Sequence, residues 1–193
     1  KGIQGHSAYP DRANNPIVAM VKLLDKLASH QLDTGTEHFD PSTLAITSVD
    51  TGNKASNVIP AVTKATVNIR FNDSHSGSSL VSWLNDEIKK VSVDYGIKFE
   101  TDFKISGESF ITPPGELSNL ISKAVKKELG VIPKLSTTGG TSDARFIKDM
   151  CPVTEFGLVG KTMHAVDERV EIKQINQLKE IYTQILEAYF EKA

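Results

Sequence analysis

The pattern of apolar and polar positions predicts two helices in the first half of the chain. The first helix covers residues 17–28, and its apolar positions recur at helical spacing: Ile17, Met20, Val21, Leu24, Leu27 and Ala28. Asn14 or Asn15 can cap this helix, and Pro16 suits its first turn. The second helix is predicted by the same spacing at Leu80, Leu84, Ile88, Val91 and Tyr95.

Strict alternation predicts the strands. Within residues 57–71 the apolar positions are Ala65, Val67, Ile69 and Phe71, which places Arg70 on the opposite, polar face. Further strands are predicted near residues 1–6, 44–49 and 97–105. The resulting order is βαββαβ. It favours an α+β fold, a ferredoxin-like sandwich with two helices on one face of a four-stranded antiparallel sheet, over residues 1–106.

Residues 107–193 have a different pattern. After a linker that contains Pro-Pro-Gly at 113–115, we expect a helix at 117–129, a short helix through Phe146 and Ile147, and a long final helix at 175–189. Short strands are predicted at 133–136 and 152–156. Helices that alternate with strands indicate an α/β layer, but so few strands cannot form a sheet covered on both faces. We therefore expect part of this layer to be missing.

Composition narrows the class of protein. Of 193 residues, 39% are hydrophobic and 24% are charged, which is typical of a soluble globular chain. The net charge of −2 gives no basic excess for nucleic-acid binding, and no apolar run is long enough for a bilayer. The one cysteine, Cys151, excludes an internal disulfide and favours a reducing compartment; its position before an apolar strand predicts a buried thiol. The start at Lys1, without Met, is typical of mid-protein sequence.

Two histidines lie where an imidazole could do chemistry. His164 follows a Gly-Leu-Val-Gly loop and precedes Asp167 and Glu168, so it could bind a metal, act as a base or remain a solvated loop residue. His6 lies on a turn beside Tyr9, where it could donate a hydrogen bond to an oxyanion or simply shape the turn.

Anion-binding groups occur at three further places. The Thr-Gly-Gly-Thr-Ser-Asp segment at 138–143 lies before a helix, where backbone N–H groups attract a carboxylate; the alternative is capping by Thr141 or Ser142. Arg70 could bind a substrate carboxylate or be solvated. Asn57 could orient an amide carbonyl or shape a turn. No Gly-x-Ser-x-Gly motif for a nucleophilic serine occurs.

Taken together, five motifs resemble the succinyl-diaminopimelate desuccinylase family. They are Gly-His-Ser-Ala-Tyr-Pro at 5–10, Asn-Val-Ile-Pro at 57–60, Asn-Ile-Arg-Phe at 68–71, Thr-Thr-Gly-Gly-Thr-Ser-Asp at 137–143 and His-Ala-Val-Asp-Glu at 164–168. The resemblance covers the whole chain in order. It implies a zinc-peptidase α/β domain with a ferredoxin-like lid inserted into it, of which this chain holds the lid and the C-terminal part.

The resemblance also implies an activity. Family members hydrolyse N-succinyl-LL-2,6-diaminopimelate to succinate and LL-diaminopimelate, on the route to lysine and cell wall. Two zinc ions, for which cobalt can substitute, activate a bridging water, and a glutamate is the general base. By this resemblance His164 is a ligand of one zinc, and His6 stabilises the oxyanion from the partner subunit. The implied substrate-binding residues are Tyr9, Asn57, Arg70, Gly140 and Thr141.

Other functions fit the same features. The closest rivals are acetylornithine deacetylase and related aminoacylases, which differ in the substrate loop. A non-catalytic dimerisation module is a third reading, because a lid of this kind pairs through an exposed sheet edge. A fourth is a small ferredoxin-like binding domain with an unrelated tail. The expected partners are a small-molecule substrate and a second copy of the chain, with no nucleic acid and no membrane, in the cytoplasm.

The chain alone is expected to be an inactive dimer. The family's other zinc ligands and its base precede the lid and have no counterpart here, and His30, His38 and His75 have no partner ligands in the sequence. We therefore expect the 193-residue chain to bind zinc poorly, to show no metal-dependent desuccinylation and to sediment as a dimer. Measurable hydrolysis by the chain alone, or a monomer at micromolar concentration, would contradict this.

Overall fold

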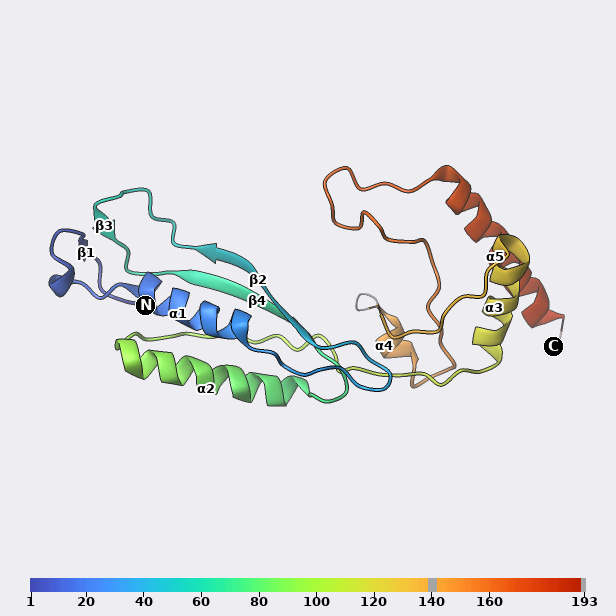
Figure 1. Ribbon diagram of the computed structural model, residues 1–193, viewed down its shortest axis with the longest axis horizontal. Helices are drawn as coiled ribbons and strands as arrows, with labels where there is room; N and C mark the ends of the chain where they lie inside the picture. Colours follow the sequence, from blue (N-terminus) through green and yellow to red (C-terminus); the bar gives the residue numbers. More distant parts are fainter. Residues whose placement is uncertain (139–141, 192–193) are drawn as a thin grey trace. The chain divides into compact units, whose positions relative to one another are not determined.

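The computed structural model describes residues 1–138 and 142–191. The chain divides into a first unit, Lys1–Ser109, and a second unit, Phe110–Ala193. Figure 1 shows both units.

Both predicted helices of the first unit are confirmed. Helix α1 spans Pro16–Ser29, and the Asn15 side chain accepts a hydrogen bond from the Ile17 N–H (3.0 Å), which caps it. Helix α2 spans Gly77–Tyr95, begins with a capping box at Ser76 and ends at Gly96 in the left-handed conformation (φ 59°). The two helices run side by side below β2 and β4 in the view of Figure 1.

Four strands form two antiparallel pairs. Strand β1 (Gly5–His6) pairs with β3 (Val58–Ile59), and β2 (Thr43–Asp50) pairs with β4 (Lys64–Arg70). Side-chain exposure alternates along β4 as the sequence predicts, and Arg70 lies on the exposed side. The register of β2 against β4 shifts between Ile46 and Ser48, so that Thr47 is an extra residue on β2. A 3₁₀ turn, η1 (Pro10–Arg12), follows β1.

The predicted strand at 97–105 is wrong. This segment does contribute Ile97, which is 3% exposed, and Phe99 to the core. It lies beside the start of the chain through a hydrogen bond from the Lys1 terminal ammonium to the Lys98 carbonyl (2.7 Å) and an ion pair between Lys1 and Glu100. The alternation of apolar residues therefore indicated burial, but a strand also needs a ladder of backbone hydrogen bonds, which this segment does not form.

The hydrogen bonds still place the segments in one order. Residues 98–100 neighbour the chain start, which neighbours the stretch 58–70, which neighbours β2. The Gly2 N–H extends the middle contact by donating to the Ala61 carbonyl (2.8 Å). With both helices packed on this layer, the first unit has the ferredoxin-like arrangement. The irregular segment 98–100 takes the place of the strand that was expected beside the chain start.

The core of the first unit lies between α1, α2 and the sheet. Its fully buried members are Ala19, Leu23, Leu27, Val91 and Ile97, and each buried leucine contributes about 1.5–3 kcal/mol. Trp83 packs against this core and stacks on the His30 ring, with 4.8 Å between ring centroids. Glu87 of α2 pairs with Lys26 of α1 and with Lys90, and hydrogen bonds from these ammonium groups hold the pKa of Glu87 below its usual value.

The described residues of the second unit, 110–138 and 142–191, contain three helices. They are α3 (Glu116–Leu129), α4 (Ala144–Ile147) and α5 (Ile172–Phe190). Helices α3 and α5 pack together through Ile121, Ala124, Val125, Ile181 and Ile185. All three helices agree with the sequence prediction.

The strands predicted at 133–136 and 152–156 are wrong: the described residues of the second unit contain no strand. Cys151 is exposed, which corrects the prediction of a buried thiol. Helix α5 also leaves Ile172, Leu186 and Phe190 more than half exposed. The described part of this unit offers these segments no neighbouring strand, although Phe156 packs against the core between α3 and α5.

Candidate functional site

The β1–β3 pairing brings two predicted site residues together. His6 lies opposite Val58 in the register, and the Ser7 N–H donates to the Asn57 carbonyl (2.9 Å). His6 and Asn57, which are 51 positions apart in the sequence, therefore lie at the same end of the first unit. Tyr9 follows on the turn into η1, where its N–H donates to the His6 carbonyl (2.9 Å).

The geometry around His6 fixes which ring nitrogen carries the proton. The Ala8 N–H donates to Nδ1 of His6 (3.0 Å). In a neutral imidazole one nitrogen accepts and the other donates, so this hydrogen bond places the proton on Nε2. The His6 ring lies 5.8 Å from the Tyr9 ring, and the Arg12 guanidinium lies 4.8 Å from the Tyr9 centroid. The side chain can therefore offer an N–H donor from an exposed turn.

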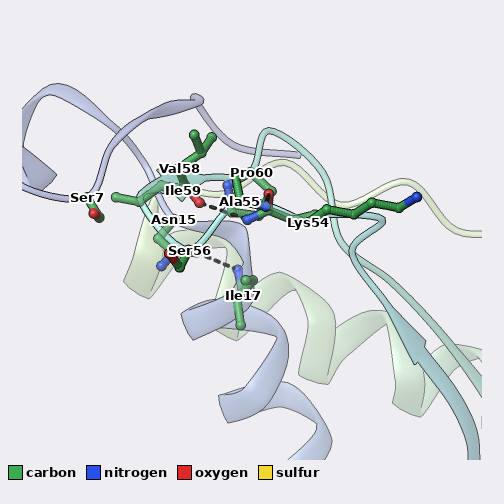
Figure 2. A pocket seen from close by; sticks show the side chains of 10 residues that line it. Ser7, Asn15, Ile17, Lys54, Ala55, Ser56, Val58, Ile59 and Pro60 are labelled. Atoms are coloured by element: carbon green, nitrogen blue, oxygen red, sulfur yellow. Dashed lines mark hydrogen bonds between the residues drawn. The ribbon is translucent and has the colours of Figure 1, made fainter.

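A pocket of about 490 Å³ lies beside the neighbouring residues His6 and Asn57. Figure 2 shows its walls, which come from the start of α1, the turn before β3, and β3 itself: Ser7, Asn15, Ile17, Asn53, Lys54, Ala55, Ser56, Val58, Ile59 and Pro60. The Asn53 side-chain amide donates to the Val58 carbonyl (2.8 Å) and shapes the turn. The Lys54 side chain extends away from the cluster of labelled residues in Figure 2. The space next to His6 and Asn57 is thus lined both by hydroxyl and amide groups and by apolar residues of α1 and β3.

Arg70 lies at the other end of the same stretch of chain. It is the last residue of β4 and pairs with Thr43. Strand β4 rises about 3.3 Å per residue over Lys64–Arg70, roughly 20 Å in all, and β1 and β3 lie beyond its starting end in Figure 1. One copy of the first unit therefore does not bring His6 and Arg70 to a common point.

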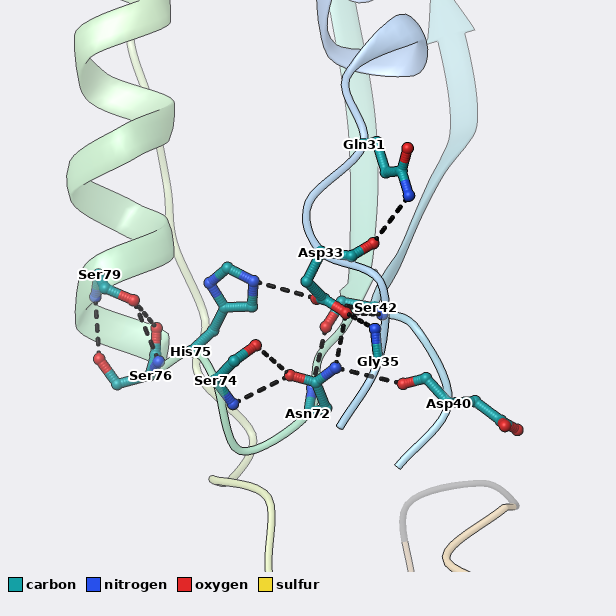
Figure 3. Close-up of polar contacts among 10 residues, drawn as sticks. All are labelled: Gln31, Asp33, Gly35, Asp40, Ser42, Asn72, Ser74, His75, Ser76 and Ser79. Carbon is teal, nitrogen blue, oxygen red and sulfur yellow. Dashed lines mark hydrogen bonds and ion pairs between the residues drawn. The ribbon is translucent and has the colours of Figure 1, made fainter. Parts of the chain in front are cut away.

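A partly buried polar cluster lies next to Arg70, and we call it the Asp33 cluster: Asp33, Ser42, Asn72 and His75 (Figure 3). The Asp33 carboxylate accepts from the Gly35 N–H (2.7 Å), the Ser42 N–H (3.1 Å) and the Asn72 side-chain amide (2.7 Å). The His75 ring lies 3.1 Å from its second oxygen. The cluster thereby joins the loop before β2 to the turn between β4 and α2.

The Asp33 carboxylate is held in its charged form. Burial alone raises the pKa of such a group, but hydrogen bonds from Ser42, Gly35 and Asn72 outweigh it and hold the pKa of Asp33 well below its usual range. Sequence reasoning missed this cluster, because its contacts join residues about 40 positions apart. A local signal was present: Asp-Thr-Gly at 33–35 is a typical Asx turn.

The second unit holds the remaining predicted site residues. His164 is exposed and has a positive φ of 60°, and its N–H donates to the Glu168 carboxylate (3.3 Å). Thr162 closes this loop by bonding both the N–H and the carbonyl of Arg169 (3.0 and 2.8 Å). Gly140 and Thr141 lie outside the described residues.

These residues do not form a metal site by themselves. Across residues 1–138 and 142–191, no three His, Cys, Asp or Glu side chains gather where they could hold a metal ion. A zinc site needs three or four protein ligands, so His164 alone does not fit the ion. The described part of the chain also contains no helix long and apolar enough to cross a membrane.

Known proteins match the chain over both units. Residues 1–96 match the model of the peptidase dimerisation domain. The succinyl-diaminopimelate desuccinylase of Cereibacter sphaeroides (strain ATCC 17025) is 64% identical over 190 residues, and that of Ruegeria pomeroyi is 65% identical over 189 residues. The chain is therefore similar to succinyl-diaminopimelate desuccinylases along nearly its whole length. These alignments cover 98% of the chain and 50% of each relative, so the chain spans half the length of the desuccinylases it matches.

A solved structure supports the fold of the chain. A tripeptidase from Staphylococcus aureus superimposes with a TM-score of 0.78 and 21% identity, covering 97% of this chain and 48% of the tripeptidase. At this identity the likeness concerns the fold alone.

The geometry around His6 leads to a spectroscopic prediction. At about pH 8.5, where an ordinary imidazole is neutral, long-range ¹H–¹⁵N correlation spectra should show His6 protonated at Nε2 and bare at Nδ1. Ala8→Pro removes the N–H that donates to Nδ1 and should mix the two tautomers, whereas Ala8→Ser keeps the N–H and should not. A wild-type His6 protonated at Nδ1 would contradict the assignment.

The Asp33 cluster leads to a prediction about acid stability. Because the folded-state pKa lies below the ordinary 3.8, the carboxylate stabilises the fold fully above pH 3.8 and loses this effect as the pH falls through the folded-state pKa. Asp33→Asn should lower the free energy of unfolding at pH 7 by about 2 kcal/mol, and the difference from wild type should shrink below pH 3.8.

Fluorescence of Trp83, the single tryptophan, reports this unfolding in urea because it lies in the first unit. Asp40→Asn is the matched control, since Asp40 lies exposed in the same loop and contributes only its backbone carbonyl to the cluster. A difference between Asp33→Asn and wild type that stays constant from pH 7 to pH 2 would exclude the charged carboxylate as its source.

Proposed function

We propose that this chain is half of a metal-dependent amidohydrolase that converts N-succinyl-LL-2,6-diaminopimelate into succinate and LL-diaminopimelate. The observation that carries the proposal is the identity of 62–65% along 98% of the chain to curated desuccinylases. That identity extends through the segments that hold the predicted site residues, from the turn at His6 to the loop at His164. The half of the relatives' length that this chain does not span then supplies the rest of the active site.

The first unit supplies substrate contacts under this proposal. Arg70 binds a substrate carboxylate through its planar donor fork, as arginine does in bidentate pairs with carboxylates. Tyr9 and Asn57 contact the substrate at the other end of the unit, beside the pocket. In the second unit, Gly140 and Thr141 hold the far end of the substrate through backbone donors.

A second copy of the chain completes this site. His6 and Arg70 lie at opposite ends of one stretch, yet both are assigned to one substrate, so they act on it from two different protomers. The Nε2–H of His6 then donates to the oxyanion that forms as the amide carbonyl is attacked. The separation within one protomer makes an in-trans contribution the simplest arrangement.

The sheet offers a surface for this dimer. Among the described residues β2 pairs with β4 alone, so the other edge of β2 carries backbone groups open to a second strand. Val18 and Val21 of α1 and Val49 of β2 are 47%, 55% and 55% exposed. We propose that two lids associate through this edge and the adjacent face of α1, which is consistent with the match to a dimerisation domain.

The family is metal-dependent, and zinc is the ion that we propose. His164 is one ligand, and the other ligands and the general base come from the half of the protein that this chain does not span. Because His164 alone cannot hold the ion, no step of the reaction follows from the metal in this chain. The proposal also places the enzyme in the cytoplasm.

The competing assignment is an acetylornithine deacetylase or a related aminoacylase. Acetylornithine carries one carboxylate, whereas succinyl-diaminopimelate carries three. The Arg70 fork and the Gly-rich loop favour the substrate with more carboxylates, because a donor that finds no partner in a closed site costs binding energy. The chain as a dimerisation module alone remains the alternative for its first unit.

A substrate comparison with the full-length protein tests the proposal. We expect kcat/KM for N-succinyl-LL-diaminopimelate to exceed that for N-acetylornithine by at least about 100-fold, because the acetyl substrate leaves carboxylate-binding donors unpaired. The rates of amine release from the two substrates, measured under identical metal loading, check this. Arg70→Ala should raise KM for the succinyl substrate. Preference for acetylornithine would contradict the assignment.

A further inference from the structure

The end of the β2–β4 ladder is secured by side chains. Thr43 and Arg70 form the last pair in the register. Just beyond it, the Asn72 N–H donates to Oγ of Ser42 (3.0 Å), so a side-chain hydrogen bond extends the ladder past Arg70. A terminal strand residue would otherwise fray, because its backbone has a partner on one side only.

Asn72 is the anchor of this extension. It is only 2% exposed, and its side-chain amide donates to Oδ1 of Asp33 (2.7 Å) and to the Asp40 carbonyl (3.2 Å). Its own Oδ1 accepts from the Ser74 N–H (3.0 Å), which fixes the turn that follows. Asn72, two residues after Arg70, is therefore buried, and its side chain makes hydrogen bonds to three other residues.

Asp33 connects these contacts to the rest of the unit. Its carboxylate accepts from the side-chain amide of Asn72, two residues after Arg70. It also accepts from the N–H of Ser42, which precedes Thr43, the residue paired with Arg70. His75 bonds the same carboxylate from the start of α2. These donors surround the negative charge of Asp33. Among the described residues, no second carboxylate side chain accepts these hydrogen bonds.

We propose that Asp33 is a positioning residue for Arg70: it fixes the backbone from which the guanidinium binds a substrate carboxylate. This inference rests on the proposed function and deepens it. Arginine has several rotatable bonds, so the placement of its fork depends first on a rigid backbone and then on packing. A displacement of about 1 Å at a binding group is enough to weaken a bidentate contact substantially.

The expected signature is a change in KM and not in kcat. A carboxylate bound away from the scissile amide contributes equally to ground state and transition state, so its loss raises KM while kcat is nearly unchanged. In the full-length protein, Asp33→Asn should raise KM for N-succinyl-LL-diaminopimelate by about 10-fold and change kcat by less than about 3-fold. Asp40→Asn, in the same loop, should change neither.

A double-mutant cycle separates positioning from general destabilisation. If Asp33 acts through Arg70, then Asp33→Asn should add no further increase in KM to a protein that already carries Arg70→Ala. Assays run well below the midpoint of thermal unfolding keep all variants folded. Should Asp33→Asn not fold, Ser42→Ala removes the hydroxyl that accepts from Asn72, and the same non-additivity with Arg70→Ala is expected.

The outcomes distinguish this inference from the proposed function. A normal KM for both Asp33→Asn and Ser42→Ala, or effects that add fully to that of Arg70→Ala, would overturn the positioning role while leaving the substrate assignment in place. An Arg70→Ala protein with unchanged KM would overturn both. A raised KM with non-additivity, together with a normal Asp40→Asn control, supports the inference.

Discussion

The backbone hydrogen bonds of residues 57–70 set the positions of the other strands in the first unit, and the rest of this unit packs on them. The beginning of this stretch pairs with β1 and the end pairs with β2, so one continuous piece of chain sets the positions of both neighbours. The first pairing places Asn57 beside the turn that carries His6, and the second places Arg70 at the end of the ladder. The two helices then cover this layer through a shared apolar core.

This two-ended geometry is the basis of the proposed contribution from a second protomer. The two pairings hold His6 and Arg70 at opposite ends of the first unit, so under this proposal both groups reach one small molecule only when two copies contribute. Because site residues lie at these ends, the order of the backbone at each end matters. At the Arg70 end the polar loop before β2 is ordered by a charged carboxylate with several donors, which is a strong arrangement because charge-assisted hydrogen bonds are about twice as strong as neutral ones.

Sequence patterns predicted the local features well. The cap at Asn15, the helix periods and the alternation along β4 are decided by residues close in sequence, and all of them are found. The errors concern partners that lie far away. Ile97 is buried as its pattern indicates, but its segment lacks a full ladder, and the strands expected in the second unit have no neighbour among the described residues.

Candidate site residues divide in the same way. The turn at His6 and the exposed side of β4 at Arg70 could be placed from local pattern, but the distance between them follows only from the pairing register. The Asp33 cluster escaped notice because its members look like ordinary loop residues until the fold brings them together. His75, which has no ligand-like neighbour in the sequence, proves to be the fourth member of that cluster.

The extra residue at Thr47 has a consequence for how chains associate. Its hydroxyl donates to the Thr66 carbonyl (3.3 Å), and the bulge interrupts the regular spacing of β2 halfway along its length. A strand laid against the open edge of β2 cannot keep a continuous ladder past that point. Unlimited edge-to-edge stacking, as in fibrils, needs flat and uninterrupted strands. The bulge therefore restricts this edge to short pairings and protects a long, exposed strand against aggregation.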